Sequence, residues 1–376
     1  MRVLHILSDS NVGGAGILLE NLLRHTALPR CDITVLLPRR AAMTARLAAE
    51  GVCVLPVLQA ADCSFSPGEV PRLLREIRRL SPDLLHTHGS LAGRVAGALC
   101  RVPIRLATRH CAYPAEGGAL RHAVYRIADA ALTTATVATA YAAVENLTAL
   151  GIPADKIIMI RNGAEPLSPT SPEERAALRH RLAIPDGAFV VGMCARLAAV
   201  KGHRTLLEAL ATPACRAMYA LLVGSGEEED ALRRYATALG VAERVIFVGY
   251  AANPAPYVNL FDAALNGSVG TETSCLALSE AMSLGIPCVA SRYGGNPEMV
   301  REGDNGLLFP PGDSAALAGA LVCLSRDPAL RAALGAGARR RYADEFGAAR
   351  MASAYDALYR RLFATREKNA RPLPQT

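Results

Sequence analysis

The chain has 376 residues, too many for one ordinary hydrophobic core, so we predict two domains of roughly 200 residues or fewer each. Hydrophobic residues make up 51% and charged residues 20%, a balance that excludes a largely disordered chain. The net charge is +7, and basic residues outnumber acidic ones in residues 1–165. Because aromatic residues are few and no nucleic-acid-binding motif is present, this charge favours phosphorylated ligands or a membrane face over nucleic acid.

The sequence contains no pattern typical of export or of a membrane span. Residues 1–14 predict a strand that runs into a loop, without the basic and long apolar segments of a signal peptide. The most apolar long stretch is interrupted by Arg126, Asp129 and Glu145, which argues against a transmembrane helix. The ten cysteines include no Cys-x-x-Cys pair. We therefore expect reduced cysteines and a cytoplasmic protein.

Short apolar segments alternate with helical patterns along the chain, which predicts βαβ units and a parallel sheet in each half. The strands expected in the first half are residues 3–7, 33–37, 52–55, 84–86, 104–108, 131–135 and 157–160. Those expected in the second half are residues 189–194, 219–223, 245–248, 263–265, 288–290 and 307–309.

A proline-rich segment, residues 161–186, separates the two series of strands. Proline lacks an amide hydrogen and disfavours continued helix, so we expect the linker and a boundary helix there. The predicted fold is α/β, with two Rossmann-like domains, residues 1–165 and 166–345, that face each other across a cleft. A C-terminal helix and tail, residues 346–376, are expected to pack back onto the first domain.

Residues 70–80 predict a basic amphipathic helix, because five apolar residues recur there at helical spacing. Two interpretations remain: a crossover helix with a solvated outer face, or a surface that docks on a membrane. The arginines on its other faces are Arg72, Arg75, Arg78 and Arg79.

The first expected strand ends in a glycine-containing loop, residues 8–16, before an apolar helix that begins near Ile17. Glycine lets the backbone approach a ligand closely, and helix N-terminal amides favour an anion. Gly13 and Gly14 could contact a phosphate or an acceptor, or could form a tight turn without a ligand. The loop lacks the Gly-x-Gly-x-x-Gly pattern, which argues against a dinucleotide-dependent dehydrogenase.

Two cations follow the first strand of the second half. Arg196 ends that strand and Lys201 precedes the next helix, so both are expected at the carboxyl edge of the sheet, where α/β proteins bind ligands. They could hold a diphosphate or could be two solvated loop charges.

Two glutamates accompany a later helix. Thr273 or Ser274 is predicted to cap it, which would place Glu272 in the preceding loop and Glu280 about two turns inside. The amides at this N-terminus could hold phosphate. A carboxylate on an otherwise apolar helix needs a partner, such as ribose hydroxyls or a salt-bridging cation.

Together these segments resemble the family-four retaining glycosyltransferases of GT-B fold, group 1 type. The Arg196 and Lys201 pair, followed by Glu272 and Glu280, is the specific part of the resemblance. The other matching segments are residues 13–14, 83–89, 108–110, 160–163 and 294–298. In one departure, residues 273–275 stand where the family often has Gly-Phe-Gly.

The resemblance implies that Arg196 and Lys201 bind the diphosphate of a nucleotide sugar and that Glu280 binds its ribose. It also implies that Glu272 contacts the donor sugar and that His110 lies near the reacting sugar, which makes these two the catalytic candidates. The residues whose amides are expected to touch phosphate or sugar are Gly14, Thr273, Ser274, Cys275 and Leu276.

The implied function is retaining transfer of a hexose or N-acetylhexosamine from a nucleotide diphosphate sugar, with UDP favoured over GDP. The expected acceptor is a glycan or a lipid-linked molecule in surface polysaccharide biosynthesis, reached at the inner membrane face. The sequence contains no Asp-x-Asp motif, so we expect neither a metal nor a cofactor. Fixed cations and helix amides would stabilise the departing diphosphate instead.

Two alternatives remain: a sugar-nucleotide epimerase of GT-B architecture and a catalytically inactive nucleotide-sugar-binding subunit. A glycosidase is disfavoured, because it needs two carboxylates at the scissile bond. With Glu280 bound to ribose, only Glu272 would remain near the sugar.

Overall fold

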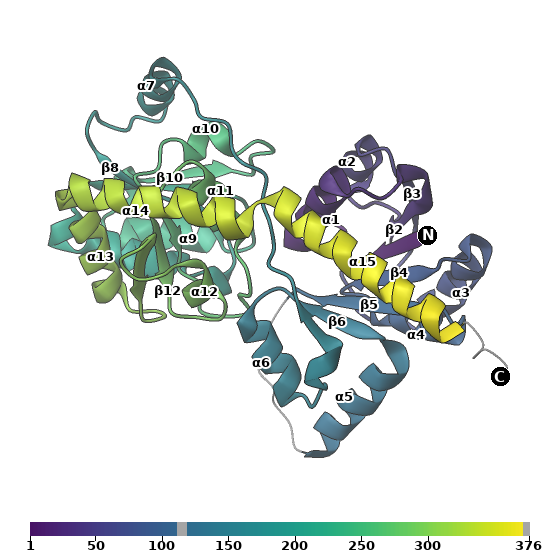
Figure 1. Ribbon diagram of the computed structural model, residues 1–376. Coiled ribbons are helices and arrows are strands. Elements are labelled where there is room, and N and C mark those ends of the chain that lie inside the picture. Colours follow the sequence, from purple (N-terminus) through teal and green to yellow (C-terminus); the bar gives the residue numbers. More distant parts are fainter. Residues whose placement is uncertain (111–118, 371–376) are drawn as a thin grey trace. The chain divides into compact units, whose positions relative to one another are not determined.

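The computed structural model describes residues 1–110 and 119–370, which form two compact units (Figure 1). Unit 1 comprises residues 1–163 and 348–376, and unit 2 comprises residues 164–347. These divisions lie close to the expected boundaries at residues 165 and 346. Of the expected C-terminal tail, residues 371–376 lie outside the described residues.

Unit 1 is built from βα repeats. Its strands are β1 (Val3–Leu7), β2 (Ile33–Pro38), β3 (Cys53–Leu58), β4 (Leu84–His88), β5 (Ile104–Arg109), β6 (Ala135–Ala138) and β7 (Ile157–Met159). Its helices are α1 (Gly14–His25), α2 (Thr44–Ala49), α3 (Glu69–Leu80), α4 (Leu91–Leu99), α5 (Ala119–Leu132), α6 (Tyr141–Ala149) and α15 (Ala348–Ala370).

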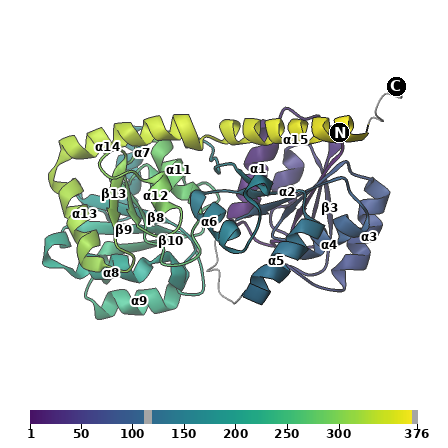
Figure 2. The same ribbon diagram turned by 60° about the horizontal axis from the view of Figure 1, so that its bottom comes forward.

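The described strands of unit 1 form a parallel sheet of order β3-β2-β1-β4-β5-β6-β7. The connections run toward one edge from β1 and toward the other edge from β4. The boundary between β1 and β4 is therefore a topological switch point, where open α/β sheets bind ligands. Apolar residues of α1 and α15 cover one face, and those of α3 and α4 cover the other (Figure 2).

The C-terminal helix α15 belongs to the core of unit 1, as the sequence predicted. Its side chains Met351, Tyr355 and Tyr359 are buried in the cluster that contains the apolar face of α1. The carboxylate of Asp356 accepts hydrogen bonds from Thr26 Oγ1 and from the amide of Ala27, just after α1 ends. Among the described helices, none combines the length and the apolar character needed to cross a membrane.

Unit 2 repeats the same architecture. Its strands are β8 (Phe189–Cys194), β9 (Met218–Val223), β10 (Val245–Gly249), β11 (Ala263–Asn266), β12 (Cys288–Ser291) and β13 (Gly306–Phe309). Its helices are α7 (Pro172–Arg181), α8 (His203–Ala211), α9 (Glu229–Ala238), α10 (Ala255–Val258), α11 (Leu276–Ser283), α12 (Asn296–Met299), α13 (Ser314–Arg326) and α14 (Pro328–Arg341).

The sheet of unit 2 has the order β10-β9-β8-β11-β12-β13 and is parallel throughout its described strands. Its switch point lies between β8 and β11. One face packs against α8, α9 and α13, and the other against α11 and α14 (Figure 2).

One expected strand is misplaced. Residues 131–135 were predicted as a strand, whereas α5 extends to Leu132 and β6 begins at Ala135. The amide and the hydroxyl of Thr133 both donate to the carbonyl of Asp129, at 2.9 and 2.8 Å, which extends the helical bonding by one residue. A run of alanine and threonine carries too little hydrophobic periodicity to fix this boundary.

Candidate active site

The donor residues predicted in unit 2 lie at the carboxyl ends of β8 and β11, the strands that border its switch point. Arg196 and Lys201 follow β8, and Glu272 follows β11. The glycine turn after the neighbouring strand β12 reaches the same edge, where the amide of Gly295 donates to the carbonyl of Glu272. The sequence positions therefore converge on one edge of the sheet, as expected from the alternation of strands and helices.

Glu272 and Lys201 form an ion pair, with Nζ 2.9 Å from Oε2. The same oxygen accepts hydrogen bonds from Asn266 Nδ2 at 3.1 Å and from Ser268 Oγ at 2.9 Å. Burial alone would raise the pKa of Glu272, but Lys201 and the two hydrogen bonds outweigh it and lower the pKa below its ordinary value. The carboxylate is therefore ionised at neutral pH.

Close backbone contacts bring Lys201 to Glu272. Gly202, the residue after Lys201, has a φ of 79°, and a Cβ there would lie 1.9 Å from the carbonyl oxygen of Gly267. The amide of Val269 donates to the carbonyl of Val200 at 2.8 Å. The loop after β8 is thus joined to the loop after β11 by main-chain contacts that only glycine permits at this position.

Arg196 occupies a different environment. Its side chain is exposed, and within the described part of the chain no hydrogen bond or ion pair involves its guanidinium. The flanking backbone is fixed, because Ala195 and Leu197 donate their amides to the carbonyls of Val223 and Ser225. Arg196 is therefore a solvent-facing cation on an anchored loop.

Helix α11 begins at Leu276, so the prediction that Thr273 or Ser274 caps it is wrong. The N-cap residue is Cys275, and no side chain accepts from the first turn. Thr273 is buried, and the amide of Cys275 points to Met299 Sδ at 3.1 Å, so packing against α12 overrides the capping preference. Within the described residues, the amides of Leu276 and Ala277 at the start of α11 have no acceptor, which suits an anion.

Glu280 lies just over one turn inside α11, rather than two turns inside as predicted. It is partly buried and has no ion-pair partner among the described residues, so a salt bridge does not explain it. Burial raises the pKa of Glu280 to about 7. A ligand that donates hydrogen bonds would stabilise the ionised form of this carboxylate.

In unit 1, a cavity of about 340 Å³ lies at the carboxyl ends of β1, β4 and β5. Asp62 accepts hydrogen bonds from the amide and the hydroxyl of Ser10, and burial, followed by the charge of Asp62, raises the pKa of Asp9. The charged and ring-bearing residues that line this cavity are Asp9, Asp62, His88, Arg94, Arg109, His110 and Asp129.

The glycine loop adjoins this cavity, which Ala15 also lines. Helix α1 begins at Gly14, with Gly13 as its N-cap, and not near Ile17 as predicted. No side chain caps the first turn, and no atom lies within 4 Å of a Cβ built on Gly14. The loop therefore presents uncapped helix amides, as a phosphate or acceptor loop would.

His110 follows β5 and is joined to other histidines inside unit 1. His88 Nδ1 lies 3.1 Å from His110 Nε2, and His88 Nε2 lies 3.2 Å from His5 Nδ1. His86 lies beside them and contacts Tyr359 Oη and Thr108 Oγ1, each at 2.7 Å. Burial is the main cause that lowers the pKa of all four histidines, to about 3 for His5 and about 4 for His110.

His5, His86 and His88 each offer one ring nitrogen, and these atoms lie within 4.8 Å of one another. A cation could bridge this spacing. However, both nitrogens of His86 and both of His88 already have hydrogen-bond partners. Hydrogen bonding accounts for the cluster without a metal ion.

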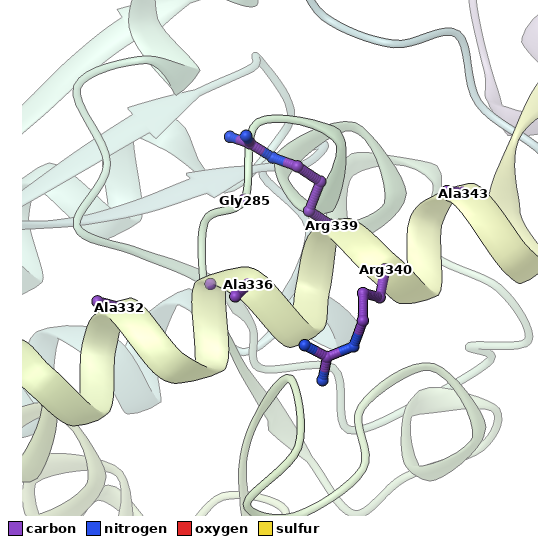
Figure 3. A pocket seen from close by; sticks show the side chains of 7 residues that line it. Gly285, Ala332, Ala336, Arg339, Arg340 and Ala343 are labelled. Atoms are coloured by element: carbon purple, nitrogen blue, oxygen red, sulfur yellow. The ribbon is translucent and has the colours of Figure 1, made fainter.

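A larger hollow of about 590 Å³ lies along α14 in unit 2 (Figure 3). Its lining is mostly glycine and alanine, with Arg339 and Arg340 pointing to different sides of the helix. Arg339 donates to the carbonyl of Leu284 at 2.8 Å, and Arg340 donates to Asp304 at 3.2 Å. Both arginines thus stabilise neighbouring loops, and the hollow contains none of the predicted site residues.

Several residues around the candidate site were not predicted from the sequence. The side-chain Nδ2 of Asn296 donates to Ser291 Oγ, and that hydroxyl donates to the carbonyl of Ser268, beside Glu272. In unit 1, His86 and His88 stand two residues apart on one strand, and such residues point to one face of a sheet. That spacing could have indicated the histidine cluster, whereas nothing in the sequence pairs His5 with His88.

Two family models match the chain. Residues 188–327 match glycosyl transferases group 1, and residues 12–166 match Glycosyltransferase Family 4. Over 345 residues the chain is 30% identical to D-inositol 3-phosphate glycosyltransferase 1 of Catenulispora acidiphila, covering 83% of this chain and 81% of the relative. It is 34% identical over 139 residues to N-acetyl-alpha-D-glucosaminyl L-malate synthase of Bacillus anthracis, covering 37% of this chain and only 36% of that relative.

Among solved structures, Anabaena Alr3699/HepE in complex with UDP and glucose is similar to the chain with a TM-score of 0.84 and 24% identity. The match covers 96% of this chain and 99% of that one. Together with the two parallel-sheet units, this likeness confirms the expected GT-B fold class. The chain belongs to the group 1, family 4 glycosyltransferases.

Proposed function

We propose that the protein transfers a hexose or N-acetylhexosamine from a nucleotide diphosphate sugar to a glycan or lipid-linked acceptor, with retention of configuration and without a metal. The main support for this function is a group of residues at the switch point of unit 2: Lys201, Glu272 and the solvent-facing Arg196. UDP is the favoured nucleotide, because a solved structure of the same fold holds UDP and glucose.

For each part of the nucleotide sugar, the site contains a residue of suitable chemistry. Lys201 carries three N–H donors, so it can keep its bond to Glu272 while it also donates to a phosphate oxygen. Arg196 can form a two-pronged hydrogen bond to the same diphosphate. Among the described residues Glu280 has no ion-pair partner, and ribose hydroxyls would donate hydrogen bonds to it. Glu272 Oε2 accepts three protein hydrogen bonds, and its Oε1 atom would accept from a sugar hydroxyl.

Retention follows if the acceptor attacks the face that the diphosphate leaves. The bond from the anomeric carbon to the diphosphate oxygen breaks, the bond to the acceptor oxygen forms, and the leaving diphosphate takes the acceptor proton. Lys201, Arg196 and the first-turn amides of α11 would stabilise the negative charge that grows on the diphosphate. Removing one such preorganised donor typically raises a barrier by about 3 to 4 kcal/mol.

The acceptor belongs to unit 1 in this proposal. The unit 1 cavity combines carboxylates, arginines and histidines, a set that can exchange hydrogen bonds with sugar hydroxyls. Membrane contact through α3 stays a prediction. Arg72 and Arg79 already pair with Glu69 and Glu76, at 3.1 and 2.7 Å, which reduces the charge available to lipid.

The first test is calorimetric binding of UDP, GDP and ADP and of their glucose conjugates, in the presence of a chelator. We expect one diphosphate to bind without metal and Lys201→Met to weaken it at least about tenfold, since a charged hydrogen bond is lost. Arg196→Met should act in the same direction. Lys156→Met and Arg204→Met are matched controls outside the site and should leave binding unchanged.

Turnover separates the proposal from its rivals. Release of UDP that requires an acceptor and yields an α-configured glycoside supports a retaining transferase. An epimerised sugar formed without an acceptor would instead identify an epimerase, and binding without turnover would identify an inactive subunit. Loss of activity in chelator that added Mg²⁺ restores would contradict metal independence.

A further inference from the structure

The string of rings that ends at His110 has a property that no single histidine has. His88 bridges His5 and His110 through its two ring nitrogens, at 3.2 and 3.1 Å. The rings of His88 and His110 are nearly stacked, with centroids 5.4 Å apart and an angle of 29° between their planes. His5 and His88 are fully buried, so the protein alone determines which nitrogen donates in each contact.

Proton counting couples the three rings. A neutral imidazole carries one N–H and one acceptor nitrogen. If His5 Nδ1 donates to His88 Nε2, then His88 Nε2 carries no proton, and His88 holds its proton on Nδ1 and donates it to His110 Nε2. Both hydrogen bonds must therefore run in the same direction along the three rings, since neutral His88 donates through one nitrogen and accepts through the other.

Two arrangements satisfy this rule. In the first, His5 Nδ1 donates to His88 Nε2. His88 is then the Nδ1–H tautomer and donates to His110 Nε2, which leaves the His110 proton on Nδ1. In the second, His110 Nε2 donates to His88 Nδ1, and His88 Nε2 donates to His5. Either arrangement fixes a single tautomer at all three rings.

The frame around the string is also held by hydrogen bonds. Both nitrogens of His86 are used, by Tyr359 of α15 and by Thr108 of β5. Thr108 Oγ1 lies 3.3 Å from Tyr355 Oη, also on α15. The ring centroids of His86 and His88 are 4.2 Å apart, so this frame packs directly against His88.

We propose that His88 is a positioning residue that sets the ring orientation and the tautomer of His110, within a hydrogen-bonded string that also includes His5. The inference rests on the proposed function only in that His110 acts at the reacting sugar. His88 itself would act through His110.

Two similar substitutions separate the contacts of His88. An asparagine amide reaches the position of the histidine Nδ1 atom, whereas a glutamine amide reaches that of Nε2. His88→Asn therefore keeps a partner for His110, and His88→Gln keeps a partner for His5 only. We expect His88→Gln to lower kcat on the order of 10- to 100-fold with little change in the KM for donor, as misplacement of a reacting group does. His88→Asn should lower kcat clearly less than His88→Gln does, because it keeps the partner of His110.

Nitrogen-15 NMR of histidine-labelled protein gives a readout that does not depend on activity. In the wild type, His110, assigned by the signal missing from His110→Ala, should show one proton-bearing and one bare nitrogen. In His88→Gln its two nitrogens should shift toward averaged values. Thermal unfolding of both His88 variants shows whether they fold.

The outcomes are distinct. Averaged nitrogens at His110 in the wild type would overturn the proposal even if neither variant folds. Equal kcat losses in folded His88→Asn and His88→Gln would also overturn it, as would stoichiometric zinc in the purified protein, because the ring nitrogens would then be ligands. A single wild-type tautomer in a protein without transferase activity would contradict the proposed function while leaving the positioning by His88 intact.

Discussion

Under the proposed function, Glu280 would link the pH to nucleotide binding. It is a partly buried carboxylate without an ion-pair partner in the described residues, and burial raises its pKa to about 7. The protonated form is therefore well populated at neutral pH before a nucleotide binds. Only the ionised form can accept from both ribose hydroxyls, so nucleotide binding should favour proton release.

We expect the affinity for UDP-glucose to rise from pH 6 to pH 8. The ionised fraction of Glu280 grows as pH rises through about 7, and well below this pKa each pH unit costs about tenfold in affinity. Glu272 adds no slope, because its pKa is lowered. Calorimetry with UDP-glucose, whose phosphates do not titrate in this range, measures the profile. Glu280→Gln should give a flat one, and a flat wild-type profile would refute the assignment.

Single site residues could be predicted from the sequence where a nearby strand or helix marks them. This holds for four residues that accompany a strand end or the first turns of a helix: Arg196, Lys201, Glu272 and Glu280. The partners of these residues could not be identified, because they are set by folding. Lys201, for example, lies 71 residues from Glu272, yet its Nζ lies 2.9 Å from Glu272 Oε2.

Between elements, loops after neighbouring parallel strands create the site by direct backbone contact. Gly202 and Gly294 both have positive φ, and a Cβ at either would lie within about 2 Å of a carbonyl oxygen of the loop after β11. Such positions accept no side chain without movement of the loop. The glycines therefore fix Lys201 and Glu272 relative to each other.

Gly202→Ala should separate the effect of crowding from that of backbone strain. Its added Cβ would meet Gly267 O at 1.9 Å, whereas Gly187, at a similar φ of 71°, has no atom within 4 Å. Gly187→Ala should cost only the strain of a left-handed residue, roughly 1–2 kcal/mol, and leave UDP binding intact. Gly202→Ala should cost more stability and weaken UDP binding at least about tenfold. Thermal unfolding and calorimetry compare the two, and equal behaviour would contradict the crowding argument.

Element boundaries were less predictable than element types. The alternation of apolar runs with helices placed nearly every strand, and the start of β8 at Phe189 was predicted to the residue. The starts of α1 and α11 were misjudged, because glycine at Gly14 and burial at Thr273 outweigh local preferences. Tertiary packing decides such ends.

At the scale of the molecule, the chain leaves unit 1 and returns to it. The first and last segments of unit 2 are hydrogen-bonded to each other, since the amide of Ala164 donates to the carbonyl of Phe346 at 2.9 Å. Helix α15 then completes the core of unit 1. Proline-rich composition indicated the first crossing from the sequence, and the second crossing, expected at residue 346, lies between residues 347 and 348.

Deletion of residues 348–376 should therefore damage unit 1 and spare unit 2. Among the described side chains, it removes six buried apolar ones, those of Ala348, Met351, Ala352, Tyr355, Leu358 and Tyr359. Full burial of one large apolar side chain contributes about 1.5–3 kcal/mol, so their combined loss approaches the entire stability of a domain, about 5–15 kcal/mol. We expect one of two thermal unfolding transitions to disappear and the other to shift upward with UDP. Deletion of residues 371–376 alone, which removes none of these side chains, is the control. Two intact transitions after the longer deletion would show that unit 1 folds without α15, and loss of the UDP-shifted transition would show that unit 2 depends on unit 1.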